Sequence, residues 1–178
     1  MSVHAFVDES QRERIYLVAT TIVDPGHLAG VRRELRALLL RGQRELHFKK
    51  ESEARRKKIA DEVAGMPIEA HVYSRLCPRR SESAAARRAC LAQITSDLLA
   101  RDARRLVLDS RESQDTEDRH TIQRVLGARP SQTHLVYEHH VSSSEPLLWL
   151  SDTIAWCYGA RGAWRDRVAP VIARVIEV

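Results

Sequence analysis

The stretch VHAFVDES, residues 3–10, decides how this chain is expected to fold. Its first five residues are mostly apolar and predict a buried strand, and Asp8 follows them directly. A carboxylate beside a hydrophobic core costs several kcal/mol unless it is paired or binds a metal. The next apolar stretch, RIYLVATTIV at residues 14–23, predicts a second strand because it is rich in β-branched residues. Since the link between the two stretches is short and polar, we expect a hairpin.

Two further aspartates stand in similarly apolar surroundings. Asp109 ends the run LVLD at residues 106–109, and Asp152 lies within LLWLSDTIAW at residues 147–156. The residues three and four positions from Asp152 are apolar, so on a helix that face should pack against a sheet. Each aspartate alone has an ordinary alternative as a turn residue, a helix cap or an ion-pair partner. Together the three carboxylates predict a divalent-metal site, provided that their segments converge.

Strand and helix patterns alternate along the rest of the chain, which predicts an α/β domain with a mixed sheet. Further strands are expected at residues 67–76, 104–109 and 133–138, and helices at about 25–39, 52–64, 82–102, 115–126 and 145–160. Asp24, Ser52 and Ser144 are interpreted as helix caps. Residues 45–50 alternate over a short length, and the apolar tail at 163–178 fits more than one element. If the strands ending at Asp8 and Asp109 are parallel neighbours, both carboxylates point into one crevice.

Composition narrows the class of protein. The chain has 178 residues, 43% of them hydrophobic and 30% charged, with a net charge of +5, which indicates a globular protein with a core. No apolar run approaches the length of a membrane span, and strand-like sequence starts too early for a signal peptide. The three cysteines are far apart and fit neither a disulfide framework nor a zinc knuckle. We therefore expect a cytoplasmic protein with no membrane partner.

Clusters of basic residues carry the positive charge and predict a polyanionic partner such as nucleic acid. One cluster comprises Arg55, Arg56, Lys57 and Lys58, and it begins shortly after residues 45–49. These four residues are candidates for contacts with the substrate. The alternative is a solvated helix face, which is a common place for basic clusters.

The order strand–Asp8, strand–Asp109, helix–Asp152 resembles the ribonuclease H-like superfamily. More narrowly, the chain resembles family 3800 of domains of unknown function. The matching pieces are HAFVDES at 4–10, YLVAT at 16–20, ELHFK at 45–49, LVLD at 106–109 and the helix at 147–160. One departure is Gln11, because members often carry glycine after the Asp-Glu-Ser motif. The resemblance implies an α/β fold with a ribonuclease H-like mixed five-stranded sheet flanked by helices. We expect residues 1–178 to form a single such domain, with a helical insertion at about 25–66.

The resemblance also implies a nuclease or related phosphoryl-transfer enzyme that uses Mg2+ or Mn2+. Asp8, Asp109 and Asp152 would hold the metal ions. The superfamily usually adds a fourth carboxylate, for which Glu45 and Glu82 are rival candidates. The narrower resemblance favours Glu45 as a catalytic metal ligand, whereas Glu82 fits an ordinary first-turn glutamate.

The segment at residues 45–50 carries further candidates. If it is extended, Glu45, His47 and Lys49 lie on one side of it. That arrangement would suit a carboxylate ligand, a catalytic or phosphate-binding imidazole and a substrate-binding lysine. The alternative is an ordinary exposed edge strand.

Our leading hypothesis is hydrolysis of phosphodiesters in nucleic acid by a two-metal mechanism, with a metal-activated water as nucleophile. The first alternative is a non-catalytic nucleic-acid-binding or protein-interaction module on the same fold. The second is a phosphatase or phosphotransferase for small molecules, which needs no extended basic surface. Metal binding at the acidic residues distinguishes the enzyme from a simple binding module.

Overall fold

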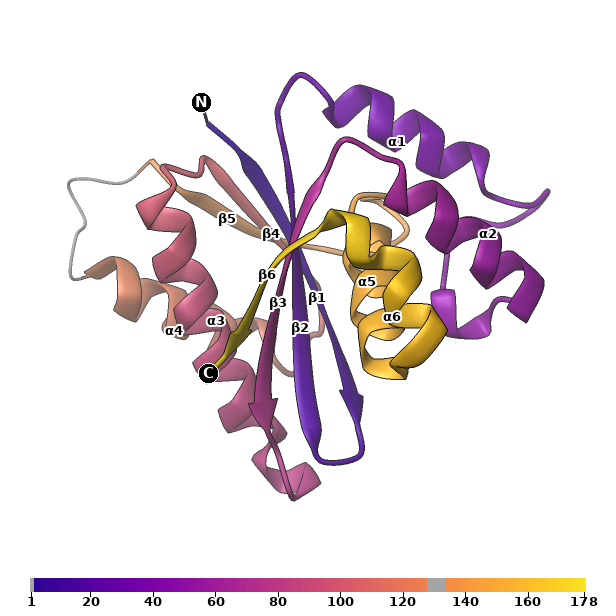
Figure 1. Cartoon of the computed structure of the whole chain (residues 1–178). Helices are drawn as coiled ribbons and strands as arrows, with labels where there is room; N and C mark the ends of the chain where they lie inside the picture. The colour runs from indigo at the N-terminus through magenta and orange to yellow at the C-terminus, as the bar shows by residue number, and fades with distance from the viewer. Residues whose placement is uncertain (1, 128–133) are drawn as a thin grey trace.

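The computed structural model of the chain describes residues 2–127 and 134–178. Its strands are β1 (His4–Arg12), β2 (Ile15–Val23), β3 (Glu69–Leu76), β4 (Arg105–Asp109), β5 (Val136–His140) and β6 (Ile172–Glu177). Its helices are α1 (Leu28–Ala37), α2 (Glu53–Ala64), α3 (Ser83–Ala100), α4 (Asp115–Gly127), α5 (Leu148–Ala160) and α6 (Gly162–Val168). The strands form one twisted layer with helices on both sides (Figure 1), so the predicted α/β class is confirmed.

The sheet has the strand order β5-β4-β1-β2-β3-β6. β1 pairs antiparallel with β2 and parallel with β4, while β4 and β5 are parallel and β2 and β3 are antiparallel. The predicted hairpin is confirmed, although β1 continues to Arg12, so the turn consists of Glu13 and Arg14 alone. The parallel pairing of β1 with β4 meets the condition under which Asp8 and Asp109 share a crevice.

Each face of the sheet has its own hydrophobic core, because apolar residues on the central strands alternate between the two faces. Phe6, Leu17 and Val107 pack beneath α5, which contributes Trp149 and Ile154. The opposite core lies under α3 and α4. Figure 1 shows α3 and α4 on one side of the sheet and α1, α2, α5 and α6 on the other.

Two parts of the predicted fold need correction. The described residues form six strands rather than five, because Ile172–Glu177 pairs in parallel with β3 as an edge strand. Much of this strand is exposed and it carries charged residues, so its sequence lacks a clear alternation. Residues 45–50 are not an extended strand either. They form a loop ending in a 3-10 turn at Phe48–Lys50, which the burial of Phe48 anchors.

The helix caps also differ in part from the prediction. Ser52 caps α2 as expected and accepts a hydrogen bond from the Arg55 amide. Ser144 does not cap α5, because its hydroxyl donates to the Val141 carbonyl and the helix begins four residues later. The Asp24 carboxylate accepts the Gly26 amide in a turn that precedes α1.

Three further predictions concern the start of the fifth strand, the helical insertion in a single domain, and membrane-spanning helices. The fifth strand was expected from residue 133, which lies outside the described residues, and β5 runs from Val136 to His140. α1 and α2 stand between β2 and β3 in the chain. That they form an insertion within a single domain stays a prediction. No helix in residues 2–127 and 134–178 combines the length and the apolar character that crossing a membrane requires.

Candidate functional site

Two neighbouring parallel strands place Asp8 and Asp109 side by side. The register of β1 and β4 pairs the residues immediately before them, Val7 and Leu108. Phe6 packs in the core beneath α5, so strand alternation places Asp8 on that same face. The same alternation on β4 turns Asp109 toward α5. Two carboxylates therefore face the same helix from adjacent positions.

The helix α5 brings Asp152 to these strands. The preceding residue, Ser151, is buried, and its hydroxyl donates to the Phe6 carbonyl of β1 at 2.8 Å. The same hydroxyl lies 2.8 Å from that of Thr21 on β2. Asp152 itself accepts a hydrogen bond from the Phe48 amide, with its Oδ2 at 3.0 Å. Buried hydrogen bonds thus fix α5 against the sheet and orient the Asp152 carboxylate.

Burial and the repulsion of neighbouring carboxylates raise the pKa of Asp8, Asp109 and Asp152. Burial has the largest effect on Asp8, followed by the charge of Glu9. Asp152 and Asp109 add to this effect, so the pKa of Asp8 lies well above its ordinary range. Burial, with added repulsion from Glu9 and Asp152, raises the pKa of Asp109 to about 6. Burial also raises the pKa of Asp152. Glu9 contributes to the rise at all three carboxylates, and Asp152 contributes at Asp8 and Asp109, so the three share one electrostatic environment.

The chemistry of this site suits a hard divalent cation. Its donors are carboxylate oxygens, which Mg2+ and Mn2+ prefer over nitrogen and sulfur. In the described structure the oxygens of Asp8, Asp109 and Asp152 do not all lie within 4.8 Å of one another. The residues present therefore fit Mg2+ or Mn2+, because they offer oxygen ligands whose charge is only partly compensated.

Arg111 forms ion pairs with Asp8 and Glu9, and the sequence analysis did not identify this role. One guanidinium nitrogen lies 2.7 Å from Glu9 Oε1 and another 3.8 Å from Asp8 Oδ1. Its charge opposes the rise in the pKa of Asp109. The Arg111 side chain is 45% exposed, so this compensation is shared with water. The only available clue was its position two residues after Asp109.

A buried arginine holds Glu9 on the opposite face of the sheet. Arg87 of α3 forms an ion pair with Glu9 and two hydrogen bonds with Asp118 of α4, at 2.8 and 2.7 Å. A buried arginine needs such partners, because an unpaired buried charge is costly. This network joins β1 to α3 and α4 directly behind Asp8. In the sequence Arg87 is one of two adjacent arginines, and nothing in that pair indicates which of the two is buried.

Asp115, Asp118 and His139 form a second group that could hold a metal ion, with ligand atoms within 4.8 Å of one another. The His139 Nε2 lies 3.2 Å from Asp118 Oδ2. Asp118 already accepts both bonds from Arg87, and Asp115 accepts the Ser110 hydroxyl at 2.7 Å. The Asp118 carboxylate is therefore already paired with a buried guanidinium, and one Asp115 oxygen is already hydrogen-bonded. For this reason the carboxylates of Asp8, Asp109 and Asp152 are the stronger candidates.

The segment at residues 45–50 reaches the site mainly through its backbone, since the Phe48 amide binds Asp152. His47 is exposed, and its charge lowers the pKa of Asp152, which places it near that carboxylate. Lys49 is exposed and lies in the 3-10 turn. Because the segment is not extended, alternation does not align Glu45, His47 and Lys49 on one side.

The two rivals for a fourth carboxylate occupy different places. Glu45 is half-buried and lies three residues before Phe48, whose amide contacts the site. Glu82 lies in a 3-10 turn before α3, where its carboxylate accepts the Arg79 amide at 3.4 Å. Glu82 therefore has the local capping contact of an ordinary first-turn glutamate.

The four basic residues of α2 have different surroundings. Arg55 is bound to a glutamate four residues before it, at 2.6 Å, and Lys57 pairs with an exposed glutamate of the same helix. Lys58 is exposed. The Arg56 guanidinium lies against the ring of Trp156, 4.8 Å from its centroid. Trp156 follows Asp152 by one helical turn, so Arg56 lies against the helix that carries Asp152.

A search of solved structures finds a similar fold in the structure of the PCNA:RNase HII complex from Archaeoglobus fulgidus. The alignment has a TM-score of 0.56 and 18% identity, and it covers 89% of this chain and 73% of that chain. At this identity the likeness shows the fold alone, and the fold is ribonuclease H-like. The comparisons with protein-family models and with curated proteins found no match.

Proposed function

We propose that this protein is a divalent-metal-dependent enzyme that hydrolyses phosphodiesters in nucleic acid. One observation carries this proposal: β1 and β4, adjacent parallel strands, turn Asp8 and Asp109 toward α5, which carries Asp152. Burial raises the pKa of all three carboxylates. The ribonuclease H-like fold supports it, since a protein of similar fold, RNase HII, is named a ribonuclease. The narrower resemblance to family 3800 of domains of unknown function belongs to the same proposal.

Asp8, Asp109 and Asp152 would be the metal ligands, with Glu45 as the fourth carboxylate. Two Mg2+ or Mn2+ ions bound there would supply Lewis-acid stabilisation and an activated water. The protein's own contribution is positional. The Phe48 amide fixes the Asp152 carboxylate, and buried hydrogen bonds of Ser151 fix the helix that carries it.

The residues around the carboxylates would bind and orient the substrate. His47 is near enough to Asp152 to affect its pKa, so it is suited to hold a phosphate oxygen or transfer a proton. Lys49 and Arg56 would contact phosphates of the bound strand. In this proposal Arg55, Lys57 and Lys58 add to the positive field along α2, with the ion pairs of Arg55 and Lys57 reducing their share.

The second candidate function is a non-catalytic nucleic-acid-binding module on the same fold. The position of Arg111 favours it, because this residue already compensates part of the negative charge of Asp8 and Glu9. A module of this kind would bind nucleic acid equally well with and without a divalent metal.

Cleavage assays with matched variants test the proposal. Purified protein is incubated with single- and double-stranded DNA, RNA and a DNA–RNA hybrid, in Mg2+, Mn2+ or EDTA. We expect metal-dependent cleavage of at least one substrate. Asp8→Asn should abolish cleavage, because it removes a ligand charge while nearly preserving the shape. Asp166→Asn, at an exposed aspartate of α6, is the control and should leave cleavage unchanged. If neither metal yields cleavage of any substrate, or if Asp8→Asn is as active as the control, the enzyme proposal is wrong.

A further inference from the structure

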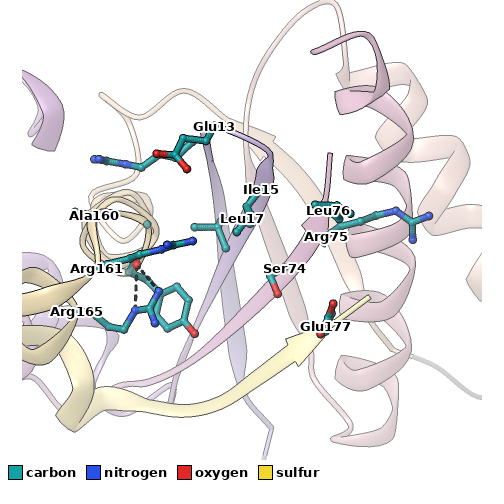
Figure 2. Close-up of a pocket in the computed structure, with 13 residues that line it drawn as sticks. Glu13, Ile15, Leu17, Ser74, Arg75, Leu76, Ala160, Arg161, Arg165 and Glu177 are labelled. Carbon is teal, nitrogen blue, oxygen red and sulfur yellow. Dashed lines mark hydrogen bonds between the residues drawn. The ribbon is translucent and has the colours of Figure 1, made fainter. Parts of the chain in front are cut away.

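A cavity of about 540 Å3 opens beside the last turn of α5, beyond the acidic site. Its size lies within the range of small-molecule sites. Ile15 and Leu17 of β2 and Leu76 of β3 form an apolar wall, and residues 158–161 with Arg165 form the opposite wall (Figure 2). The cavity therefore combines an apolar surface with guanidinium groups.

The surface of β1 connects this cavity with the acidic site. Asp8, Ser10 and Arg12 are alternate residues of one strand and so lie on one face. Arg12 lines the cavity and also a smaller hollow that it shares with Ser10, Lys49 and Arg56. A chain of polar and basic side chains thus leads from the carboxylates to the cavity.

Two residues of α5 set the position of Arg12. The Arg12 guanidinium carbon lies 4.5 Å from the ring centroid of Trp156, at a distance typical of a cation–π contact. Gly159 lies one helical turn further on, and because it has no side chain it leaves room for the Arg12 side chain. A Cβ at Gly159 would approach Arg12 Cδ to 3.2 Å and Leu17 Cδ1 to 3.1 Å. The helix is therefore shaped to let Arg12 lie against it at the cavity.

Arg161 adopts a backbone conformation that glycine ordinarily occupies. Its φ is 62° and its ψ is −174°. Side chains rarely tolerate this region, and strained residues cluster at sites of function. The next residue is Gly162, which tolerates a positive φ, whereas the strained position one residue before it is occupied by Arg161. In the described part of the chain, the Arg161 guanidinium makes no hydrogen bond or ion pair, and it extends toward Leu17 in the cavity (Figure 2).

The other charged residues that line the cavity are less suited to bind a ligand. Arg165 donates to the Tyr158 carbonyl at 3.2 and 3.1 Å and so closes the end of α5. Arg75 contributes to the lining, but its side chain points away toward α3 (Figure 2). Glu13 and Glu177 lie at the rim, where their negative charge opposes an anion in part. Positive charge still predominates at the cavity.

We infer that this cavity binds a nucleotide of the same nucleic-acid strand whose phosphodiester lies at the three carboxylates. Arg12 and Arg161 bind its backbone phosphate, and the sugar and base lie against the apolar wall. Asp152 and Arg161 are nine residues apart, which is about 13 Å along a helix. In a stacked strand with about 3.4 Å per nucleotide, the cavity is about four nucleotides from the reacting bond.

This inference rests on the proposed function, so its test measures binding without catalysis. The affinity of a fluorescently labelled 12-nucleotide single strand is measured by anisotropy in EDTA, over a range of salt concentrations. Arg161→Gly is compared with Arg88→Ala, which removes the same charge from an exposed position on α3. Arg12→Ala is a second variant in the cavity.

Arg161→Gly and Arg12→Ala should each weaken binding about tenfold, and each should flatten the slope of log affinity against log salt by about 0.7. Arg88→Ala should do neither. The melting temperature of Arg161→Gly should equal or exceed that of the wild type, because the backbone strain is removed. This pattern without any metal-dependent cleavage would support the inference while contradicting the enzyme proposal.

Three outcomes would overturn the inference. In the first, the cavity variants bind the strand as tightly as Arg88→Ala does. In the second, the wild type binds no single strand in EDTA. In the third, poly-glutamate displaces the strand at equal charge concentration, and Arg161→Gly and Arg12→Ala both bind poly-glutamate more weakly than the wild type does. That result would assign the cavity to acidic peptides.

Discussion

Replacing Asp109 by asparagine should stabilise the protein in the absence of metal, although it removes a metal ligand from the proposed site. Burial, with repulsion from Glu9 and Asp152, raises the pKa of the Asp109 carboxyl group to about 6. Asparagine has nearly the same shape and carries no charge. The variant therefore retains the packing and removes the repulsion.

The pH dependence follows from the direction of the pKa shift. Between about pH 4 and pH 6 the folded protein retains a proton on Asp109 that the unfolded chain has released. Stability therefore falls as the pH rises through this interval. A pKa of about 6 against an ordinary value of 3.8 corresponds to at most about 3 kcal/mol at neutral pH. Partial exposure of the carboxylate reduces this to about 1–2 kcal/mol.

Urea denaturation in EDTA measures this effect, at pH 4.0 and at pH 7.5. Asp109→Asn should gain about 1–2 kcal/mol at pH 7.5, which is about 2–8 °C in melting temperature, and little or nothing at pH 4.0. The control Asp166→Asn retains Asp109 and should therefore follow the wild type at both pH values. Saturating Mn2+ should stabilise the wild type by about 2.7 kcal/mol at one hundred times its Kd, and the variant by much less. A variant that is no more stable than the wild type at pH 7.5 in EDTA would refute the proposed repulsion.

Three other variants test the surrounding structure. Arg87→Ala should lose about 3–5 kcal/mol of stability in urea, because it leaves Glu9 and Asp118 as buried charges without their partner; a loss below about 1 kcal/mol would contradict this role. Ser151→Ala should cost about 1–3 kcal/mol and lower kcat more than it raises KM, since it loosens the helix that carries the third carboxylate; an unchanged kcat would show that the hydroxyl does not position that helix. Arg111→Ala should tighten Mn2+ binding about fivefold in calorimetry, which corresponds to about 1 kcal/mol for removing a partly exposed competing cation; equal or weaker affinity would mean that Arg111 does not compete with the metal.

The central part of the fold was predictable because its signals are local and repeated. The strands ending at Asp8 and Asp109 are apolar over several residues, and a parallel pairing of such strands has few alternatives. Asp152 stood out because it interrupts an apolar helix. The edge strand β6 was not predictable in the same way. It is mostly exposed, so its identity as a strand depends on pairing with β3 rather than on its own pattern.

The parts of the site that the sequence did not reveal depend on contacts between distant residues. Residues 45–50 alternate like a strand, yet the burial of Phe48 and its bond to Asp152 turn them into a loop and a 3-10 turn. Arg87 of α3 finds its partners on β1 and α4, and no local sequence pattern encodes contacts between such distant residues. The strained conformation of Arg161 is likewise invisible in sequence, since its neighbour Gly162 is the residue that turn chemistry favours.

Anomalous scattering from Mn2+ in crystals of the protein would test the proposed metal centre most directly. We expect a peak bounded by the carboxylates of Asp8, Asp109 and Asp152, and its loss in Asp8→Asn. A peak at Asp115, Asp118 and His139 instead, or no peak at millimolar Mn2+, would contradict the proposal that the three convergent carboxylates form the metal site.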